Sequence, residues 1–290
     1  MPTHTTRARA LVLVLTAVLA VLGLGVAPAS ARPADRTPPA GSTYLALGDS
    51  VPFGFRANNP GGYADAADFV GYPELVAQDL GLRLLNATCP GETTSSFIDV
   101  TAASNGCTNR NGVAGAYRDF APLHVPYPLP ESQLDYAVQT LRATPDVSLV
   151  TLQLGANNAF ICQTSTPGRC TGADEQAALL GQVQGELDQI LTALREQAHY
   201  TGRIVVVTYY ALQYSGGQSL STLVLDTAIA ATAREHDATI ANGYAAFLPR
   251  ARQAGGSSVA AGLVLPGDVH PTADGQRLLA DAVEHVLRRR

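Results

Sequence analysis

Lysine is absent from this chain of 290 residues, and arginine supplies all 19 of its basic side chains. Schiff-base catalysis, a Ser–Lys dyad and a phosphate-binding P-loop all require an ammonium group, and arginine cannot be deprotonated to act as a base in its place. Charge is also scarce, because charged residues make up 15% of the chain and the formal net charge is −5. Neutralising phosphates requires a basic face, so we expect no nucleic-acid partner.

Residues 1–31 have the features of a secretory signal peptide. Two arginines precede residues 11–27, which carry no charge, and residues 29–31 are Ala-Ser-Ala, which a signal peptidase accepts. An uncleaved membrane anchor is the alternative, since the apolar run is near the lower length limit for spanning a bilayer. We expect cleavage before Arg32, a secreted extracellular protein, a flexible lead-in over residues 32–42, and no stable membrane insertion after cleavage.

Four cysteines follow this segment, and an even number in an exported chain indicates disulfides. Three pairings are possible. We favour Cys89–Cys107 and Cys162–Cys170, because the partners are near each other in sequence and lie in segments rich in Gly, Thr, Ser and Asn. A zinc site would need a C-x-x-C or H-E-x-x-H spacing, which the sequence lacks, so we expect no metal.

Short apolar runs with β-branched members alternate with longer segments of helical periodicity across residues 43–290. The strand-like runs are 43–47, 82–87, 147–154, 204–209 and 238–242, and the helical segments are 72–80, 132–142, 173–198, 220–235 and 272–287. Strands and helices in alternation predict parallel strands covered by helices on both faces. We expect a single α/β domain with a three-layer α/β/α architecture and a mostly parallel, doubly wound sheet.

Residues 104–130 interrupt this alternation with many Asn, Gly and Pro residues. An irregular segment of this length is usually either functional or disordered. The aromatic side chains of Tyr117, Phe120 and Tyr127 argue against disorder. We expect a wall or lid over an apolar substrate site, and a surface loop held by Cys107 is the alternative.

The chemically suggestive residues follow the carboxyl ends of the expected strands, where ligands bind in open parallel sheets. The motifs are Gly48-Asp49-Ser50, Cys89-Pro90-Gly91, Gly155-Ala156-Asn157-Asn158 and, near the C-terminus, Asp268-Val269-His270-Pro271. Each motif alone is ordinary turn or capping chemistry. Together they supply a serine, an imidazole to accept its proton, and N–H donors for an oxyanion, as an acyl-transfer site requires.

Particular atoms can be assigned to these roles. Ser50 is the candidate nucleophile and His270 its base. The main-chain N–H groups of Ser50 and Gly91 and the side-chain amide of Asn157 are the candidate oxyanion donors. Gly91 suits its role because it has no Cβ to obstruct the approaching oxygen.

The order of these motifs resembles the SGNH hydrolase superfamily, the GDSL-type esterases and lipases. The family's blocks resemble residues 45–50, Gly91, residues 155–158 and His270-Pro271. The resemblance implies that Ser50 is the nucleophile, that Gly91 and Asn157 donate to the oxyanion and that His270 is the base. It also implies a flavodoxin-like fold and no metal or organic cofactor.

Two positions depart from the family's pattern. Its third block usually ends in Asp, where this chain has Asn158, and an Asp usually stands three residues before the histidine, where this chain has Gly267. The nearest carboxylate is Asp268, two residues before His270. Either Asp268 or a main-chain carbonyl near Gly267 could orient the imidazole, and we favour Asp268 as the third member of the triad.

These features predict a secreted serine hydrolase that cleaves carboxylic esters through a Ser-linked acyl-enzyme. We expect a monomer. Its substrate is expected to be a small-molecule or lipid ester with an aliphatic acyl group, and phospholipase or lysophospholipase activity falls within this expectation. A carbohydrate O-acetyl esterase with the same site is the main alternative. The chain has no tryptophan, which weakens that alternative, since sugar clefts commonly stack a ring on indole. A non-catalytic exported binding module is the third hypothesis.

Overall fold

The structure is a computed structural model, and it describes residues 37–288. The expected signal peptide lies outside the described residues, as does the first part of the lead-in. The last residues of the expected lead-in form hydrogen bonds with the domain. The Gly41 N–H donates to the Gly81 carbonyl at 2.7 Å, and the hydroxyl oxygens of Ser42 and Ser148 lie 2.6 Å apart.

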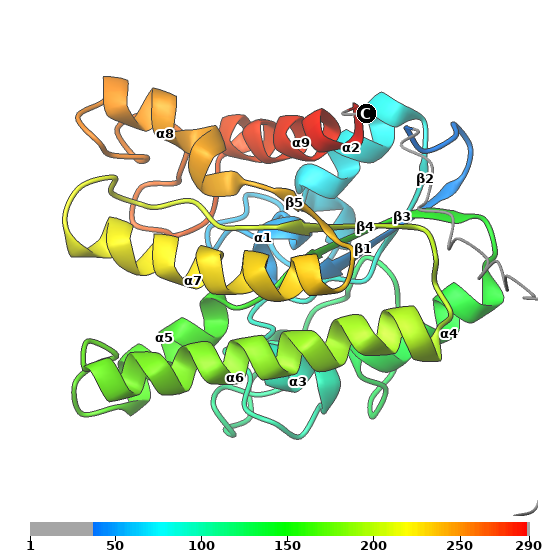
Figure 1. The fold of residues 1–290 in the computed structure, drawn as a ribbon, viewed down its shortest axis with the longest axis horizontal. Coiled ribbons are helices and arrows are strands. Elements are labelled where there is room, and N and C mark those ends of the chain that lie inside the picture. The colour runs from blue at the N-terminus through cyan, green and yellow to red at the C-terminus, as the bar shows by residue number, and fades with distance from the viewer. Residues whose placement is uncertain (1–36, 289–290) are drawn as a thin grey trace, which may run out of the picture. The chain divides into compact units, whose positions relative to one another are not determined.

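Five parallel strands form one sheet in the order β2-β1-β3-β4-β5 (Figure 1). The strands are β1 (Thr43–Gly48), β2 (Arg83–Asn86), β3 (Val147–Gln153), β4 (Arg203–Val207) and β5 (Thr239–Ala241). All five coincide with the apolar runs expected from the sequence. Their leucine- and valine-rich composition is typical of parallel strands that are buried on both faces.

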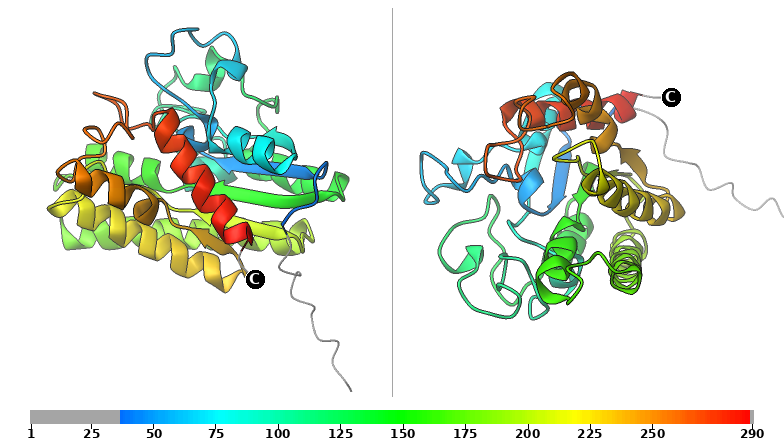
Figure 2. Two further views of the ribbon diagram at one scale, coloured as in Figure 1. Left: turned by 90° about the horizontal axis from the view of Figure 1, so that it is seen from above. Right: turned by 90° about the vertical axis from the view of Figure 1, so that its left-hand side faces the viewer.

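Helices cover both faces of the sheet, which confirms the three-layer α/β/α architecture (Figures 1 and 2). One layer contains α2 (Tyr72–Leu80), α8 (Gly243–Gln253) and α9 (Ala273–Arg288), and the other contains α3 (Thr94–Ile98), α4 (Gln133–Ala143), α5 (Ala156–Ser165), α6 (Ala173–Thr192) and α7 (Gly217–Glu235). A π-helical segment, Ala193–Gln197, extends α6. Within residues 37–288, no helix combines the length and apolarity needed to cross a membrane.

Three of these helices were not expected from the sequence. Two of them, α3 and α5, begin within or just after the motif loops and bury few apolar side chains, so they lack the periodic apolar face that predicts a helix. The third, α8, contains Pro249, which interrupts the helical pattern in the sequence.

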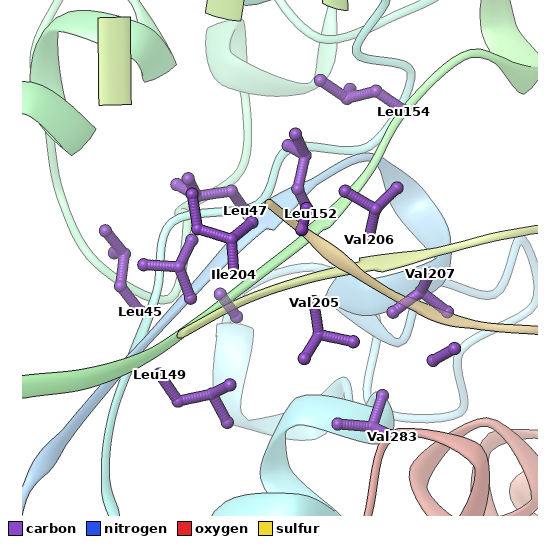
Figure 3. Packing of buried hydrophobic residues seen from close by; sticks show 14 of the residues in the cluster. Leu45, Leu47, Leu149, Leu152, Leu154, Ile204, Val205, Val206, Val207 and Val283 are labelled. Carbon is purple, nitrogen blue, oxygen red and sulfur yellow. The ribbon is translucent and has the colours of Figure 1, made fainter. Parts of the chain in front are cut away.

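Alternate strand residues point into the two helical layers (Figure 3). Leu149 and Val205 lie on the same side of the sheet as Val283 of α9, whereas Leu152 and Val206 lie on the opposite side. All five side chains are buried. Because a shift of one residue would reverse every side chain, this two-sided burial fixes the register and therefore the positions of the strand ends.

Candidate active site

The turn after β1 presents Ser50. Gly48 has a φ of 136°, and a Cβ at this position would lie 2.3 Å from the Gln153 carbonyl oxygen, so only glycine allows the strand to leave the sheet here. Asp49 is buried and accepts hydrogen bonds from the Val51 N–H at 2.9 Å and the Tyr209 hydroxyl at 2.5 Å. Burial raises the pKa of Asp49 to about 6. Its side chain caps a short helix, α1 (Ser50–Phe53), which begins at the serine.

Ser50, His270 and Asp268 form a continuous hydrogen-bonded row. The Ser50 hydroxyl oxygen lies 2.9 Å from Nε2 of His270, and Nδ1 of His270 lies 2.5 Å from Oδ1 of Asp268. The Ser50 residue is 9% exposed, and the other two side chains are 12% and 13% exposed, so the row is shielded from water but open at one side. This is the geometry in which an imidazole removes a proton from a hydroxyl while a carboxylate fixes its tautomer.

The structure places Asp268, and not a main-chain carbonyl, against the imidazole. Oδ1 of Asp268 also accepts from the main-chain N–H groups of Val269 and His270 at 2.6 and 3.3 Å, and Oδ2 accepts from the Ala57 N–H at 3.2 Å. Partial burial opposes ionisation of Asp268, but the hydrogen bond and charge of His270 and these N–H donors hold its pKa well below the usual range. The side chain is therefore a carboxylate at every pH near neutrality.

The three candidate oxyanion donors come from separate segments of the chain that meet beside Ser50. Within residues 37–288, the N–H groups of Ser50 and Gly91 take part in no main-chain hydrogen bond. Asn157 accepts a bond from Asn105 Nδ2 at 2.8 Å, and its own Nδ2 donates one hydrogen to the Glu92 carbonyl at 3.0 Å. An amide nitrogen carries two hydrogens, so one hydrogen of Asn157 remains for a ligand.

Gly91 is required at its position by its backbone. Its φ is 83°, and a Cβ would lie 2.5 Å from the Asn105 carbonyl oxygen. The disulfide Cys89–Cys107 joins the loop that contains Gly91 to the segment that contains Asn105, with Cα atoms 5.6 Å apart. The second disulfide, Cys162–Cys170, joins the end of α5 to the following loop, with Cα atoms 5.4 Å apart. Both pairings are those favoured from the sequence.

A cavity of about 880 Å³ opens beside Ser50 at the carboxyl edge of the sheet, the edge that faces the viewer in the right-hand view of Figure 2. Its polar base contains Ser50, Gly91, Asn157 and His270. Its walls are largely apolar and include Phe55, Tyr63, Tyr117, Phe120, Phe160, Leu179, Leu180, Leu212, Leu220, Val224 and Leu225. The cavity can therefore hold an apolar group against the reactive serine.

Residues 104–130 contribute part of this wall. Tyr117 and Phe120 line the cavity, and their rings lie 5.7 Å apart, centre to centre. Tyr127, in contrast, is buried in the main core, where its hydroxyl donates to the Ala87 carbonyl at 3.0 Å. The part of the segment around Tyr117 and Phe120 therefore forms cavity wall, and the part around Tyr127 packs into the core.

Two tyrosines after β4 support the site and were not singled out in the sequence. The Tyr209 hydroxyl holds Asp49, and the Tyr210 hydroxyl donates to the Val269 carbonyl at 2.6 Å, next to His270. Both line the cavity. Their position directly after a strand is the signal that could have identified them.

One group within the described residues has the spacing of a metal site. Ligand atoms of Cys89, Glu92 and Cys107 lie within 4.8 Å of one another. The two sulfurs are joined in a disulfide, however, and a disulfide supplies no thiolate to a metal.

Residues 46–278 match the GDSL-like Lipase/Acylhydrolase family. The chain belongs to this family. Membership in the GDSL-like acylhydrolase family supports ester hydrolysis as the activity of this site. A search of curated proteins finds no match.

Solved structures share the fold of this GDSL-like chain. The acetylxylan esterase Axe2 from Geobacillus stearothermophilus has a TM-score of 0.55 and 17% sequence identity, over 88% of this chain and 97% of Axe2. LAE5, an alpha/beta hydrolase enzyme from the metagenome of Lake Arreo, Spain, has a TM-score of 0.53 and 15% identity, over 86% of this chain and 96% of LAE5. At such low identity these similarities show the fold alone.

Proposed function

We propose that this protein is a secreted serine hydrolase that cleaves esters of aliphatic acids through an acyl-enzyme. Ser50 Oγ attacks the ester carbonyl carbon while its proton passes to Nε2 of His270, and Asp268 stabilises the resulting imidazolium. The imidazolium then returns the proton to the leaving alkoxide. Water, activated by the same imidazole, hydrolyses the acyl-Ser50 ester and releases the acid.

The oxyanion formed in each half-reaction is stabilised by preplaced donors. We assign this role to the N–H groups of Ser50 and Gly91 and to Nδ2 of Asn157. The hydrogen bonds of Asn157 to Asn105 and Glu92 support the assignment, because they fix the amide in one orientation before substrate arrives.

The apolar cavity wall is the reason for proposing an aliphatic acyl group as the substrate's acid part. Apart from the reactive groups, the wall beside Ser50 is built mainly from aromatic rings and the aliphatic side chains of α6 and α7. A buried methylene group contributes about 0.8 kcal/mol, so a cavity of this kind favours an alkyl chain over a sugar ring. The volume of about 880 Å³ lies within the range of ligand sites that enclose most of a small molecule.

Removal of an acetyl group from a carbohydrate is the competing function, and the acetylxylan esterase Axe2 shares this fold. The two functions make opposite predictions for a series of p-nitrophenyl esters from acetate to laurate, measured beside acetylated xylan. We expect kcat/KM to rise with chain length beyond acetate and little acetate to be released from xylan. Highest activity on the acetyl ester together with deacetylation of xylan would instead establish the carbohydrate esterase.

A pair of neighbouring variants on α7 tests the wall itself. Val224 lines the cavity, whereas Leu223, the preceding residue with similar exposure, does not. Val224→Trp should shift the preferred ester to a shorter chain, and Leu223→Trp should leave the preference unchanged. Equal effects of both variants would show that the acyl chain does not bind along this wall.

Catalysis itself is tested with a fluorophosphonate probe, which labels an activated serine. We expect the probe to label the wild-type protein and not the Ser50→Ala variant. A wild-type protein that is not labelled would indicate a binding module without activity.

Secretion has its own test. The two disulfides support an oxidising compartment, and the N-terminal sequence of protein recovered from culture medium should begin at Arg32. Retention in the membrane with an intact N-terminus would contradict cleavage. Gel filtration of the recovered protein should show a monomer.

A further inference from the structure

Glu92 is a buried acid that the reaction described above does not use. It follows Gly91 directly, is 1% exposed and lies outside the cavity lining. Its Oε1 accepts a hydrogen bond from the Ser96 hydroxyl at 2.5 Å, and its Oε2 accepts one from Gln133 Nε2 at 3.0 Å. A buried carboxyl group is costly unless it is hydrogen-bonded, so its presence behind the oxyanion loop calls for an explanation.

Gln133 carries the contact of Glu92 on to the nucleophile turn. Its Oε1 accepts from the Gly48 N–H at 2.6 Å, and its Nε2 donates to the Gly48 carbonyl at 3.1 Å as well as to Glu92. Both polar groups of Gly48, two residues before Ser50, are thereby held by one amide. One hydrogen of Nε2 is donated to Gly48 and the other to Glu92, so Glu92 is the second acceptor that holds this amide in place.

The main chain of Glu92 reaches the third oxyanion segment. Its carbonyl accepts the hydrogen bond from Asn157 Nδ2 at 3.0 Å that orients that amide. One residue is therefore bonded to Asn157, adjacent in the chain to Gly91, and connected through Gln133 to the turn that carries Ser50. These are the three segments that supply the oxyanion donors.

We propose that Glu92 is a positioning residue that aligns the three oxyanion donors. It does so through the length of its side chain, which places its acceptor oxygens against Gln133 and Ser96, and not through its charge. The inference rests on the proposed function, since it requires a tetrahedral oxyanion.

The surroundings of Glu92 accept a neutral side chain. Burial raises the pKa of Glu92 to about 7, against hydrogen bonds from Ser96 and Gln133 that lower it. When Oε1 is protonated it can donate to the Ser96 hydroxyl oxygen, whose own hydrogen can turn to Thr93 Oγ1, 3.0 Å away. The bond from Gln133 to Oε2 is the same in both protonation states.

Two substitutions separate the effect of side-chain length at position 92 from the effect of its charge. Glu92→Gln keeps the length of the side chain, with its oxygen toward Gln133 and its amide nitrogen toward Ser96, but removes the charge. Glu92→Asp keeps the charge but withdraws the carboxyl group by one methylene. On a p-nitrophenyl ester cleaved by the wild type, we expect Glu92→Gln to keep kcat within about threefold, and Glu92→Asp to lower kcat by about tenfold or more with KM within about twofold.

The split between kcat and KM is decisive, because misaligned oxyanion donors affect the transition state and not substrate binding. A tenfold or greater loss of kcat in Glu92→Gln overturns the proposal whether or not Glu92→Asp folds, and so does a folded Glu92→Asp with wild-type kcat. Glu284→Met is the control, because it removes another buried, hydrogen-bonded carboxylate, on α9, and should leave kcat and KM unchanged. An inactive wild type would refute the proposed function instead, so the two failures are distinguishable.

Discussion

Replacing Asp268 in two ways measures separately how it orients His270 and how its charge stabilises the imidazolium. Asp268→Ala removes the acceptor from Nδ1 of His270 altogether. In a Ser-His-Asp site the loss of the carboxylate costs about 10⁴-fold in kcat, of which the wrong imidazole tautomer is a large part. We expect a loss of this size for Asp268→Ala.

Asp268→Asn should be milder, because the structure dictates how the amide must face. Among the residues that the structure describes, Oδ1 receives three donors, the N–H groups of Val269 and His270 and the imidazole, whereas Oδ2 receives only the Ala57 N–H at 3.2 Å. The amide oxygen therefore takes the place of Oδ1 and its NH₂ group faces Ala57. His270 keeps an acceptor and its tautomer.

The remaining costs of Asp268→Asn are a neutral acceptor in place of a charged one and the lost hydrogen bond from the Ala57 N–H, which an NH₂ group cannot accept. Hydrogen bonds to charged groups are stronger by about 1–2 kcal/mol, and each 1.4 kcal/mol is tenfold in rate. We expect kcat to fall by about 10²-fold or less, with KM unchanged. The assay is steady-state hydrolysis of a p-nitrophenyl ester, with thermal unfolding measured on each variant.

Asp274→Asn is the matched control, because Asp274 pairs with Arg250 at 2.9 Å on the surface and should show wild-type rates. Equal losses near 10⁴-fold in Asp268→Asn and Asp268→Ala would refute the orientation derived from the hydrogen bonds. A loss under tenfold in Asp268→Ala would show that a main-chain carbonyl orients His270.

Three further predictions use other residues. Ser50→Ala should leave less than about 1% of the wild-type rate with the thermal transition unchanged, and a higher residual rate would exclude Ser50 as the nucleophile. Asn157→Ala should lower kcat by roughly 10²–10³-fold at constant KM, and an equal effect on KM would contradict an oxyanion role. Burial raises the pKa of Glu74 from 4.5 to about 7, so the stability contributed by its neutral form is complete below about pH 4.5 and is lost as the pH rises through 7. The wild type should therefore lose about 2.5 kcal/mol of unfolding free energy relative to Glu74→Gln between pH 5 and pH 8, and a difference that does not change with pH would contradict the shift.

Much of the fold could be predicted because its signals are local. Each strand contains a short run of apolar residues, and the parallel order follows from the helices between the runs. The strand-end rule then placed Ser50, Gly91, Asn157 and His270 at one edge of the sheet, and the structure brings all four to one cavity.

The supports of the site could not be predicted, because each is a contact between residues distant in sequence. Glu92 and Gln133 are 41 residues apart, and Tyr209 lies 160 residues from Asp49. A glutamate or glutamine in the sequence is ordinarily a surface residue. Only the packing of α4 against the turn after β1 shows that these polar side chains are buried and bonded.

Asn158 shows how such a contact explains a departure from the family's usual residue. Its Oδ1 accepts from the Thr94 N–H at 3.1 Å, and its Nδ2 donates to Thr94 Oγ1 at 2.8 Å. The hydroxyl hydrogen of Thr94 is itself donated to the carboxylate of Glu186 on α6. Thr94 Oγ1 is therefore an acceptor on the side of residue 158, where the carboxylate of an Asp would have no hydrogen to donate. An amide satisfies both contacts of Thr94, so Asn158 holds the start of α3 beside the oxyanion loop because Glu186 already occupies the threonine's only hydroxyl hydrogen.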